Sequence, residues 1–233
     1  MRTASIALLL AFVGRPVLAQ VQPSEAPAVP VFQEPHHHLV FENALVRVLD
    51  VRVAPGETTG YHVHANRHIA VVISGARTWE QFRGQAASAV ESVADSVGTV
   101  FDNASASLPY THRVGNADTV PFRYVVAQLL APSEIVAPAL PASSGLTMHR
   151  DSLGARIYRV SLAPGQSTPK HRHSPPGLTV QVSPGTLRLE GAAPEGASEQ
   201  PGAGAWWWRG AGTEHVLRNV GTSQVDVVEI DWP

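Results

Sequence analysis

Short apolar runs that end at turn residues dominate most of the chain. The first run is marked by Val46, Val48, Val51 and Val53, and it stops at an Ala-Pro-Gly turn, residues 54–56. Further runs follow at residues 69–73, 99–101 and 121–130. Because these runs are short and bounded by Gly, Pro and Ser, they predict β-strands rather than helices.

The same pattern occurs twice. Residues 156–165 repeat the apolar run and turn of residues 46–56, and the copies lie about 105–110 residues apart, which indicates a duplicated domain rather than a short repeat. Residues 133–147 are rich in Ala, Pro and Ser without periodicity, and they predict a linker. We therefore expect two β-domains, at residues 38–132 and 148–233.

Four histidines of the first domain form a candidate metal site, called site one. His62 and His64 are two residues apart on a predicted strand, so their side chains point to the same side. His68 has the same parity, and His112 lies far downstream. Imidazoles in this arrangement suit Fe, Zn, Ni, Cu or Mn rather than Mg or Ca.

The second domain carries a similar set, called site two. His171 and His173 repeat the His-x-His spacing, and His215 corresponds to His112. Three histidines leave a coordination position open to water or substrate. Because site two has one imidazole fewer, we expect site one to bind its metal more tightly. Imidazole must be neutral to bind, so metal should leave as the pH falls below about 6.

The spacing around these histidines resembles the two motifs of the cupin superfamily. Gly56, five residues, His62-Val63-His64, three residues, His68, six residues and Gly75 fit the first motif, with His68 where the family has Glu. His112 and Asn116 fit the end of the second motif. The resemblance covers residues 38–233, and in the second domain the Glu position falls on Gly177 or Leu178.

This resemblance implies an all-β bicupin, with two antiparallel jelly-roll (cupin) barrels in tandem. It implies one or two divalent transition-metal ions and two classes of function. One is a mononuclear metal-dependent dioxygenase, isomerase or lyase acting on a small, anionic organic substrate. The other is a non-catalytic barrel that binds a small ligand or a metal alone. No general base is evident beyond the metal ligands, so the catalytic residues are not assigned.

Composition narrows the remaining choices. The 233 residues carry a formal net charge of −2, which gives no indication of nucleic-acid binding. Cysteine is absent, which excludes disulfides and thiol catalysis. The binding partner expected is a small molecule, and the sequence leaves open whether the protein forms a homo-oligomer.

Three other segments have alternative interpretations. Residues 206–208 are all Trp; on a strand, Trp206 and Trp208 share a face, which fits core packing or an aromatic wall for a ligand near site two. The triplet of residues 36–38 is all His, which fits either a metal-binding tail or a solvated strand edge; we expect the strand edge, because no partner ligands are nearby. Residues 84–98 fit either a short helix or an irregular loop. His149 lies outside both motifs and is expected on the surface.

The N-terminus is typical of an export signal. Arg2 precedes an apolar run at residues 6–13, which is too short to span a bilayer, and residues 17–19 form a cleavage site. We therefore expect a signal peptide at residues 1–19, a disordered lead-in at residues 20–37, and a periplasmic or extracellular protein without stable membrane insertion after cleavage.

Overall fold

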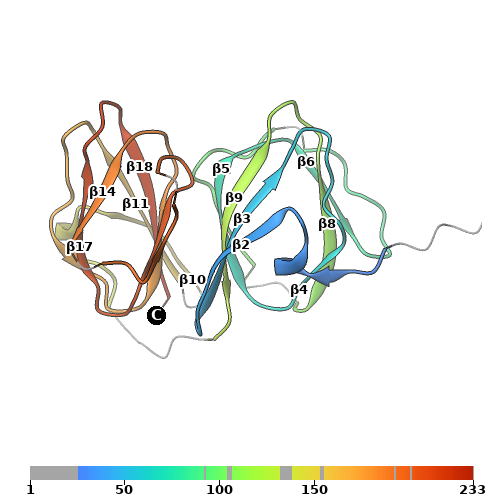
Figure 1. The fold of residues 1–233 in the computed structure, drawn as a ribbon, viewed down its shortest axis with the longest axis horizontal. Helices are drawn as coiled ribbons and strands as arrows, with labels where there is room; N and C mark the ends of the chain where they lie inside the picture. The colour runs from blue at the N-terminus through green and yellow to red at the C-terminus, as the bar shows by residue number, and fades with distance from the viewer. Residues whose placement is uncertain are drawn as a thin grey trace, which may run out of the picture.

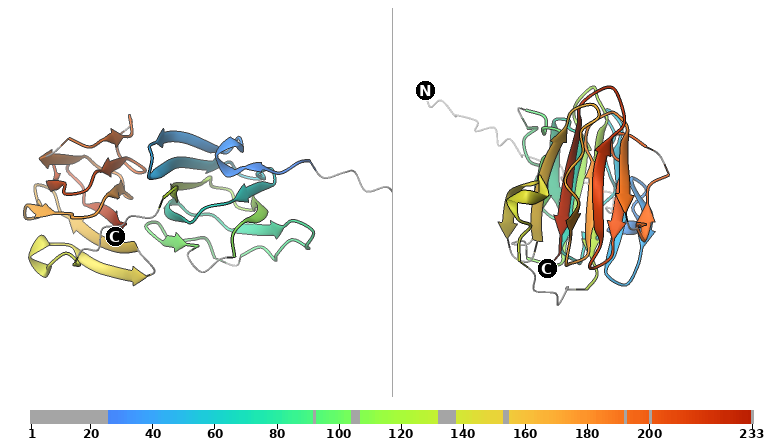
Figure 2. Two further views of the ribbon diagram at one scale, coloured as in Figure 1. Left: turned by 90° about the horizontal axis from the view of Figure 1, so that it is seen from below. Right: turned by 90° about the vertical axis from the view of Figure 1, so that its left-hand side faces the viewer.

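The chain forms two β-barrels that lie side by side (Figures 1 and 2). This computed structural model describes residues 26–91, 93–103, 107–131, 138–152, 155–191, 193–199 and 201–232. Within those ranges every regular element is a β-strand, apart from two short 3₁₀ turns, η1 (Val31–Gln33) and η2 (Ala142–Ser144). None of the helical elements described is long and apolar enough to cross a bilayer.

Barrel one is built from two sheets that face each other. The smaller sheet has the order β1-β4-β8-β6, and the larger has the order β2-β3-β9-β5-β7. All pairs are antiparallel except β1 with β4. The strands are β1 (Val29–Pro30), β2 (His37–Glu42), β3 (Val46–Val53), β4 (His62–His64), β5 (His68–Ser74), β6 (Thr78–Phe82), β7 (Val100–Asp102), β8 (Tyr110–Asn116) and β9 (Phe122–Leu129).

Barrel two repeats this plan, and all of its strand pairs are antiparallel. Its larger sheet has the order β10-β11-β18-β13-β16-β15, and its smaller sheet has the order β12-β17-β14. The strands are β10 (Thr147–Ser152), β11 (Ala155–Leu162), β12 (His171–Arg172), β13 (Gly177–Gln181), β14 (Leu187–Gly191), β15 (Gly196–Ala197), β16 (Trp206–Arg209), β17 (Glu214–Asn219) and β18 (Val225–Asp231). The expected all-β fold with two antiparallel jelly-roll barrels is therefore confirmed.

The central strands of the two larger sheets bury both of their faces. One face of each packs into a shared apolar core between the barrels, which contains Val46 and Val48 of β3 together with Val228 and Ile230 of β18. The other face points into its own barrel, as Leu49 of β3 does. The period-2 alternation of a strand therefore decides which residues reach the interior, where the histidines lie.

The two Asn residues of the second motif close the same turn in each barrel. The Asn116 side-chain amide donates to the carbonyl oxygens of Val53 and Val120, each at 2.9 Å. The Asn219 amide makes the matching bonds to Leu162 and Ser223, at 2.8 and 2.7 Å. The duplication therefore extends to individual hydrogen bonds.

Part of the expected disordered lead-in is ordered. Val29 and Pro30 pair with β4, and Val31 and Glu34 are buried against barrel one. Apolar burial and strand pairing thus order a segment whose Pro-rich composition suggested disorder. The expected signal peptide, residues 1–19, lies outside the described residues.

Two further segments can now be placed. The described residues between β6 and β7 form turns and irregular loop, so the loop alternative holds there rather than the helix. His149, on β10, is exposed, as expected.

Candidate metal centres

Site one brings together histidines from neighbouring strands of the smaller sheet. His62 and His64 lie on β4, and β4 pairs with β8 so that His62 stands opposite His112. These three buried side chains can each offer a nitrogen within 4.8 Å of the others. The Nε2 atoms of His64 and His112 are 3.0 Å apart, close to the spacing of about 2.9–3.4 Å between adjacent ligands around a metal with 2.0–2.1 Å bonds.

Backbone and carboxylate partners fix two of these rings. His62 Nδ1 donates to the Gly60 carbonyl oxygen at 2.9 Å, and His112 Nδ1 donates to the Glu80 carboxylate. With Nδ1 engaged, the Nε2 atom is the one left for a metal. Burial, reinforced by His37 and His112, lowers the pKa of His62 to about 3, so its ring is neutral and ready to bind.

His68 lies beside this group but is less well held. Its ring centroid is 4.5 Å from that of His64, and its Nδ1 is buried without a hydrogen-bond partner. It is not part of the compact group formed by His62, His64 and His112. The structure therefore places His68 on the wall of the site.

A cavity of about 470 Å³ opens onto site one, and all of its lining residues belong to barrel one. The histidines form one part of the wall, and apolar residues such as Leu49, Val51 and Phe122 form another. The loop between β6 and β7 contributes Glu91 and Asp95, and Asp95 accepts a hydrogen bond from the Tyr124 hydroxyl. Site one thus has space for a small organic molecule next to its histidines.

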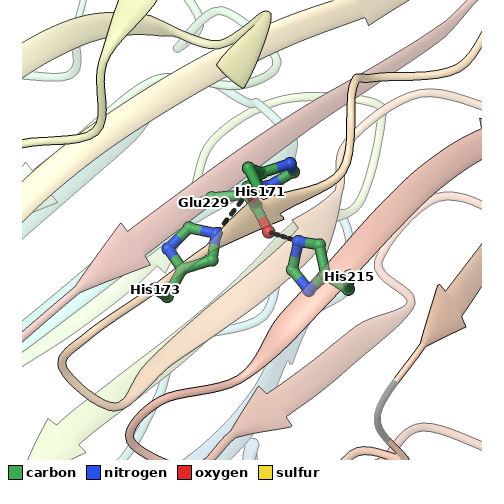
Figure 3. A group of neighbouring side chains, drawn as sticks. All are labelled: His171, His173, His215 and Glu229. Carbon is green, nitrogen blue, oxygen red and sulfur yellow. Dashed lines mark hydrogen bonds and ion pairs between the residues drawn. The ribbon is translucent and has the colours of Figure 1, made fainter. Parts of the chain in front are cut away.

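Site two has a fourth member that the sequence analysis missed. His171, His173 and His215 surround the carboxylate of Glu229 (Figure 3). The carboxylate oxygens lie 3.3, 3.2 and 3.2 Å from the Nε2 atoms of His171, His173 and His215. A tetrahedron with metal bonds of 2.0–2.1 Å has edges of about 3.3 Å, so the four groups are spaced as metal ligands are.

The hydrogen bonding of the donor atoms in site two also fits a metal ion. The Nε2 atoms of His173 and His215 are fully buried and have no hydrogen-bond partner of good geometry. Such orphaned buried nitrogens are costly unless something binds them. His171 Nδ1 donates to the Pro169 carbonyl oxygen, as His62 Nδ1 does to Gly60, and His173 Nδ1 faces Asp231 at 2.7 Å.

Glu229 was missed because it comes from a different strand than the family motif specifies. It lies on β18 opposite Thr179, two residues along β13 from the motif's Glu position at Gly177. A Cβ at residue 177 would lie 2.7 Å from the Arg209 guanidinium, so Arg209 fills the space of the expected carboxylate. One signal was present in the sequence: Glu229 is an acidic residue on the parity of the interior-facing Val225 and Val227 of the same strand.

The charges of site two call for a cation. Glu229 and Asp231 contribute two negative charges, and the buried Arg209 contributes one positive charge. Burial opposes ionisation of Glu229, but the neighbouring histidines, His173 first, hold its pKa well below the ordinary value. Burial and Arg209 oppose a charge on His173, yet Glu229 and Asp231 outweigh them and raise its pKa. Either a proton on His173 or a metal ion can supply the missing charge.

Trp206 and Trp208 lie in the core rather than at a ligand site. Both are buried in the apolar layer between the barrels, where the Trp206 ring meets Phe41 with centroids 5.7 Å apart. Trp207 points to the other face, as strand parity predicts, and packs in barrel two. The aromatic-wall alternative is therefore not supported, and the packing alternative is.

The histidine triplet is only partly at a solvated edge. His38 is exposed, but His37 is buried with its ring 4.5 Å from that of His62. His37 Nδ1 donates to Glu34 at 2.6 Å, and Glu34, His37 and His62 form a third group that could hold a metal. The expectation that no partner ligands lie near was wrong, because the strand pairing of β1 with β4 folds this segment back onto site one.

Comparisons with known proteins agree with this architecture. No family model matches the chain. A curated relative, the beta-alanine degradation protein BauB of Pseudomonas aeruginosa, is 35% identical over 86 residues, which cover 36% of this chain and 88% of that protein.

Solved structures with the same fold cover both barrels. AerE from Microcystis aeruginosa has a TM-score of 0.59 and 15% identity over 88% of this chain and 96% of its own. Salicylate 1,2-dioxygenase from Pseudaminobacter salicylatoxidans has a TM-score of 0.52 and 13% identity, over 81% and 71%. Oxalate decarboxylase from Bacillus subtilis, with Mn(II) centres, has a TM-score of 0.50 and 14% identity, over 82% and 69%. These likenesses show that the chain shares the two-barrel fold of these proteins, which is the fold that the resemblance to the cupin superfamily implied.

Proposed function

We propose that this protein is a metal-dependent enzyme that acts on a small organic molecule in barrel one, while site two in barrel two holds a structural metal. The observation that carries the proposal is the cavity of about 470 Å³ that opens onto His62, His64 and His112. Catalytic metal sites keep a coordination position open to substrate, whereas structural sites are closed by protein ligands.

The contrast between the two sites supports this division. Site two has four protein ligands, and His173, His215 and Glu229 have no solvent exposure. Site one has three compactly placed ligands and a cavity beside them. A substrate atom can therefore complete the shell of site one, and Glu229 already does so in site two.

The chain's own residues would prepare the reaction in three ways. His62, His64 and His112 would hold the metal, with Gly60 and Glu80 fixing two of the rings. The apolar wall formed by Leu49, Val51 and Phe122 would exclude water and orient the substrate. When bound, the metal would supply Lewis-acid or redox chemistry.

The reaction class follows from what such a site can bind. Without a carboxylate among its compact ligands, site one keeps the full charge of a divalent ion and favours an anionic oxygen, such as a carboxylate or enolate. Oxidative cleavage, isomerisation and lyase chemistry all begin from such a complex. The fold is shared with a dioxygenase and a decarboxylase, which supports this range without selecting within it.

We also propose that the protein is exported. Arg2, the apolar run at residues 6–13 and the small residues at 17–19 have the order of a secretory signal. The intact mass of the exported protein tests this, because cleavage should leave Gln20 as the first residue. Retention of residues 1–19 in the exported form would contradict it.

Metal analysis combined with a substrate screen tests the enzymatic function. Tag-free protein should contain a transition metal, and it should convert at least one member of a panel of hydroxybenzoates, catechols and 2-oxo acids, followed by O₂ consumption and mass spectrometry. His64→Ala should abolish turnover, whereas His149→Ala, an exposed histidine outside both sites, should not. If metal-loaded protein binds panel members without converting any, the non-catalytic binding barrel becomes the better account.

A further inference from the structure

The segment before the first long strand belongs to site one. β1 pairs in parallel with β4, the strand that carries His62 and His64, and Val29 stands opposite His62. The chain then turns through η1 and delivers His37 to the same wall, with Glu34 bonded to its Nδ1. This segment thus approaches the site from outside the two motifs.

His37 is held as the ligand histidines of this protein are held. Its Nδ1 donates to the Glu34 carboxylate, just as His112 Nδ1 donates to Glu80. A carboxylate can only accept, so Nδ1 carries the proton and Nε2 is left free. This carboxylate–histidine pairing is the usual support of a metal-binding imidazole, and His68, the alternative fourth ligand, lacks it.

Glu34 is itself firmly fixed. Its carboxylate accepts from the backbone N–H groups of His36 and Gly60 and from the side chain of His36, at distances of 2.9 to 3.0 Å. It is buried, so it places a fixed negative charge one imidazole away from site one. Such a charge orients the imidazole and strengthens it as a metal donor without itself joining the ligand set.

We propose that His37 is a fourth protein ligand of the metal in site one, supported by Glu34 and delivered by the N-terminal segment. His62 belongs both to the group with Glu34 and His37 and to the group with His64 and His112, so the two groups adjoin at His62. This inference rests on the proposed metal in site one. It leaves coordination positions for substrate if the metal takes five or six ligands.

Metal affinity of matched variants tests the proposal. The probes are Zn(II), measured in competition with a chromophoric chelator, and Co(II), whose visible absorption reports the ligand set. The metal ion bound in site one is the one that His64→Ala removes. His37→Gln should lower the affinity for this ion by about 10- to 100-fold and shift its Co(II) spectrum. His38→Gln, an exposed neighbour on the same strand, should leave both unchanged. Glu34→Gln should lower the affinity for the same ion by about 10-fold.

Thermal unfolding of the metal-free variants shows whether a loss of affinity comes from a loss of folding. If His37→Gln does not fold, the Co(II) spectrum and affinity of Glu34→Gln test the proposal instead. If His37→Gln binds both metals as His38→Gln does, with an unchanged spectrum, His37 is not a ligand and site one remains a three-histidine site. If His64→Ala binds as many metal ions as the wild-type protein does, site one holds no metal. The proposed function then fails, and this inference fails with it.

Discussion

Glu229 gives site two its closed character. Its carboxylate faces the Nε2 atoms of three histidines and also accepts from the Thr179 hydroxyl at 2.6 Å. In barrel one, the corresponding position on β9 is Val126, which leaves the space for the cavity. The difference between Val126 in barrel one and Glu229 in barrel two thus accounts for an open site one and a closed site two.

Glu229→Gln should remove the metal from site two and destabilise the protein. The amide keeps the shape but loses the charge that the buried histidines and Arg209 face, and breaking such a network costs about 3–5 kcal/mol. Metal content and urea unfolding measure the two effects. Glu214→Gln is the control, because its pair with Lys170 is exposed to solvent and contributes little to stability. Full metal content and unchanged stability in Glu229→Gln would contradict the assignment.

The pH dependence of site one follows from its buried histidines. Burial is the largest cause that lowers the pKa of His62 to about 3 and of His68 to about 4, from 6.5 in the unfolded chain. Between those values the unfolded chain binds protons that the folded chain does not, so stability falls as the pH drops from 6.5 toward 3. The same rings stay neutral in the folded protein, so metal should be retained at pH 5 rather than lost below about 6.

Urea unfolding of the metal-free protein at pH 7, 5.5 and 4.5 checks the first statement, and the metal content of metal-loaded protein at the same pH values checks the second. The free energy of unfolding should decrease stepwise while folded protein keeps its metal. Complete metal loss from folded protein at pH 5.5 would show that these histidines titrate normally.

At the scale of elements, strand parity made much of the fold and of both sites predictable. His62 with His64, and His171 with His173, share a face because a strand repeats every two residues. Parity could place Glu229 inside barrel two but not beside the histidines, and it could not place His37 at site one. Their places depend on which strands pair, β13 with β18 and β1 with β4, and such pairing between distant segments leaves no local pattern. The ordered structure of residues 29–37 could not be predicted for the same reason.

Gly177→Ala tests the packing that replaces the motif's carboxylate. On β13 a Cβ at this position would lie 2.1 Å from the Ile230 carbonyl oxygen and 2.7 Å from Arg209, so β18 or Arg209 must shift. Overpacking of this kind costs about 1–3 kcal/mol. Gly60→Ala is the matched control, because its nearest contact is 3.8 Å away. Thermal unfolding should separate the two variants, and equal stability would show that the strand pair accommodates a side chain.

At the scale of the whole molecule, the barrels are joined through their larger sheets. Apolar residues of both barrels fill one core, and Arg123 of barrel one bonds to Asp50 and to the Ala203 carbonyl oxygen of barrel two. The duplication therefore buries a face of each larger sheet that a single barrel would expose to solvent. The two sites stand on opposite sides of this shared core, within their own barrels.

Trp206→Ala should destabilise the whole chain without changing site one. Removing this side chain from the shared core should cost about 3–5 kcal/mol. Trp207→Ala, on the same strand but half-buried on the other face, should cost less. Urea unfolding gives the stability, and Zn(II) affinity gives the state of site one. A loss of Zn(II) affinity at site one in folded Trp206→Ala protein would show that the site depends on the contact between the barrels.

We propose that site one is open to solutes and that site two is closed by Glu229. Anomalous difference maps of crystals of tag-free protein, collected before and after a short soak in chelator, test this directly. We predict metal peaks at both clusters before the soak and, afterwards, loss of the peak at His62, His64 and His112 with retention of the peak at Glu229. This order reverses the ranking expected from the sequence, because site two has the ligand that it was thought to lack. Retention at site one with loss at site two, or no metal at the barrel-one cluster in either map, would contradict the account.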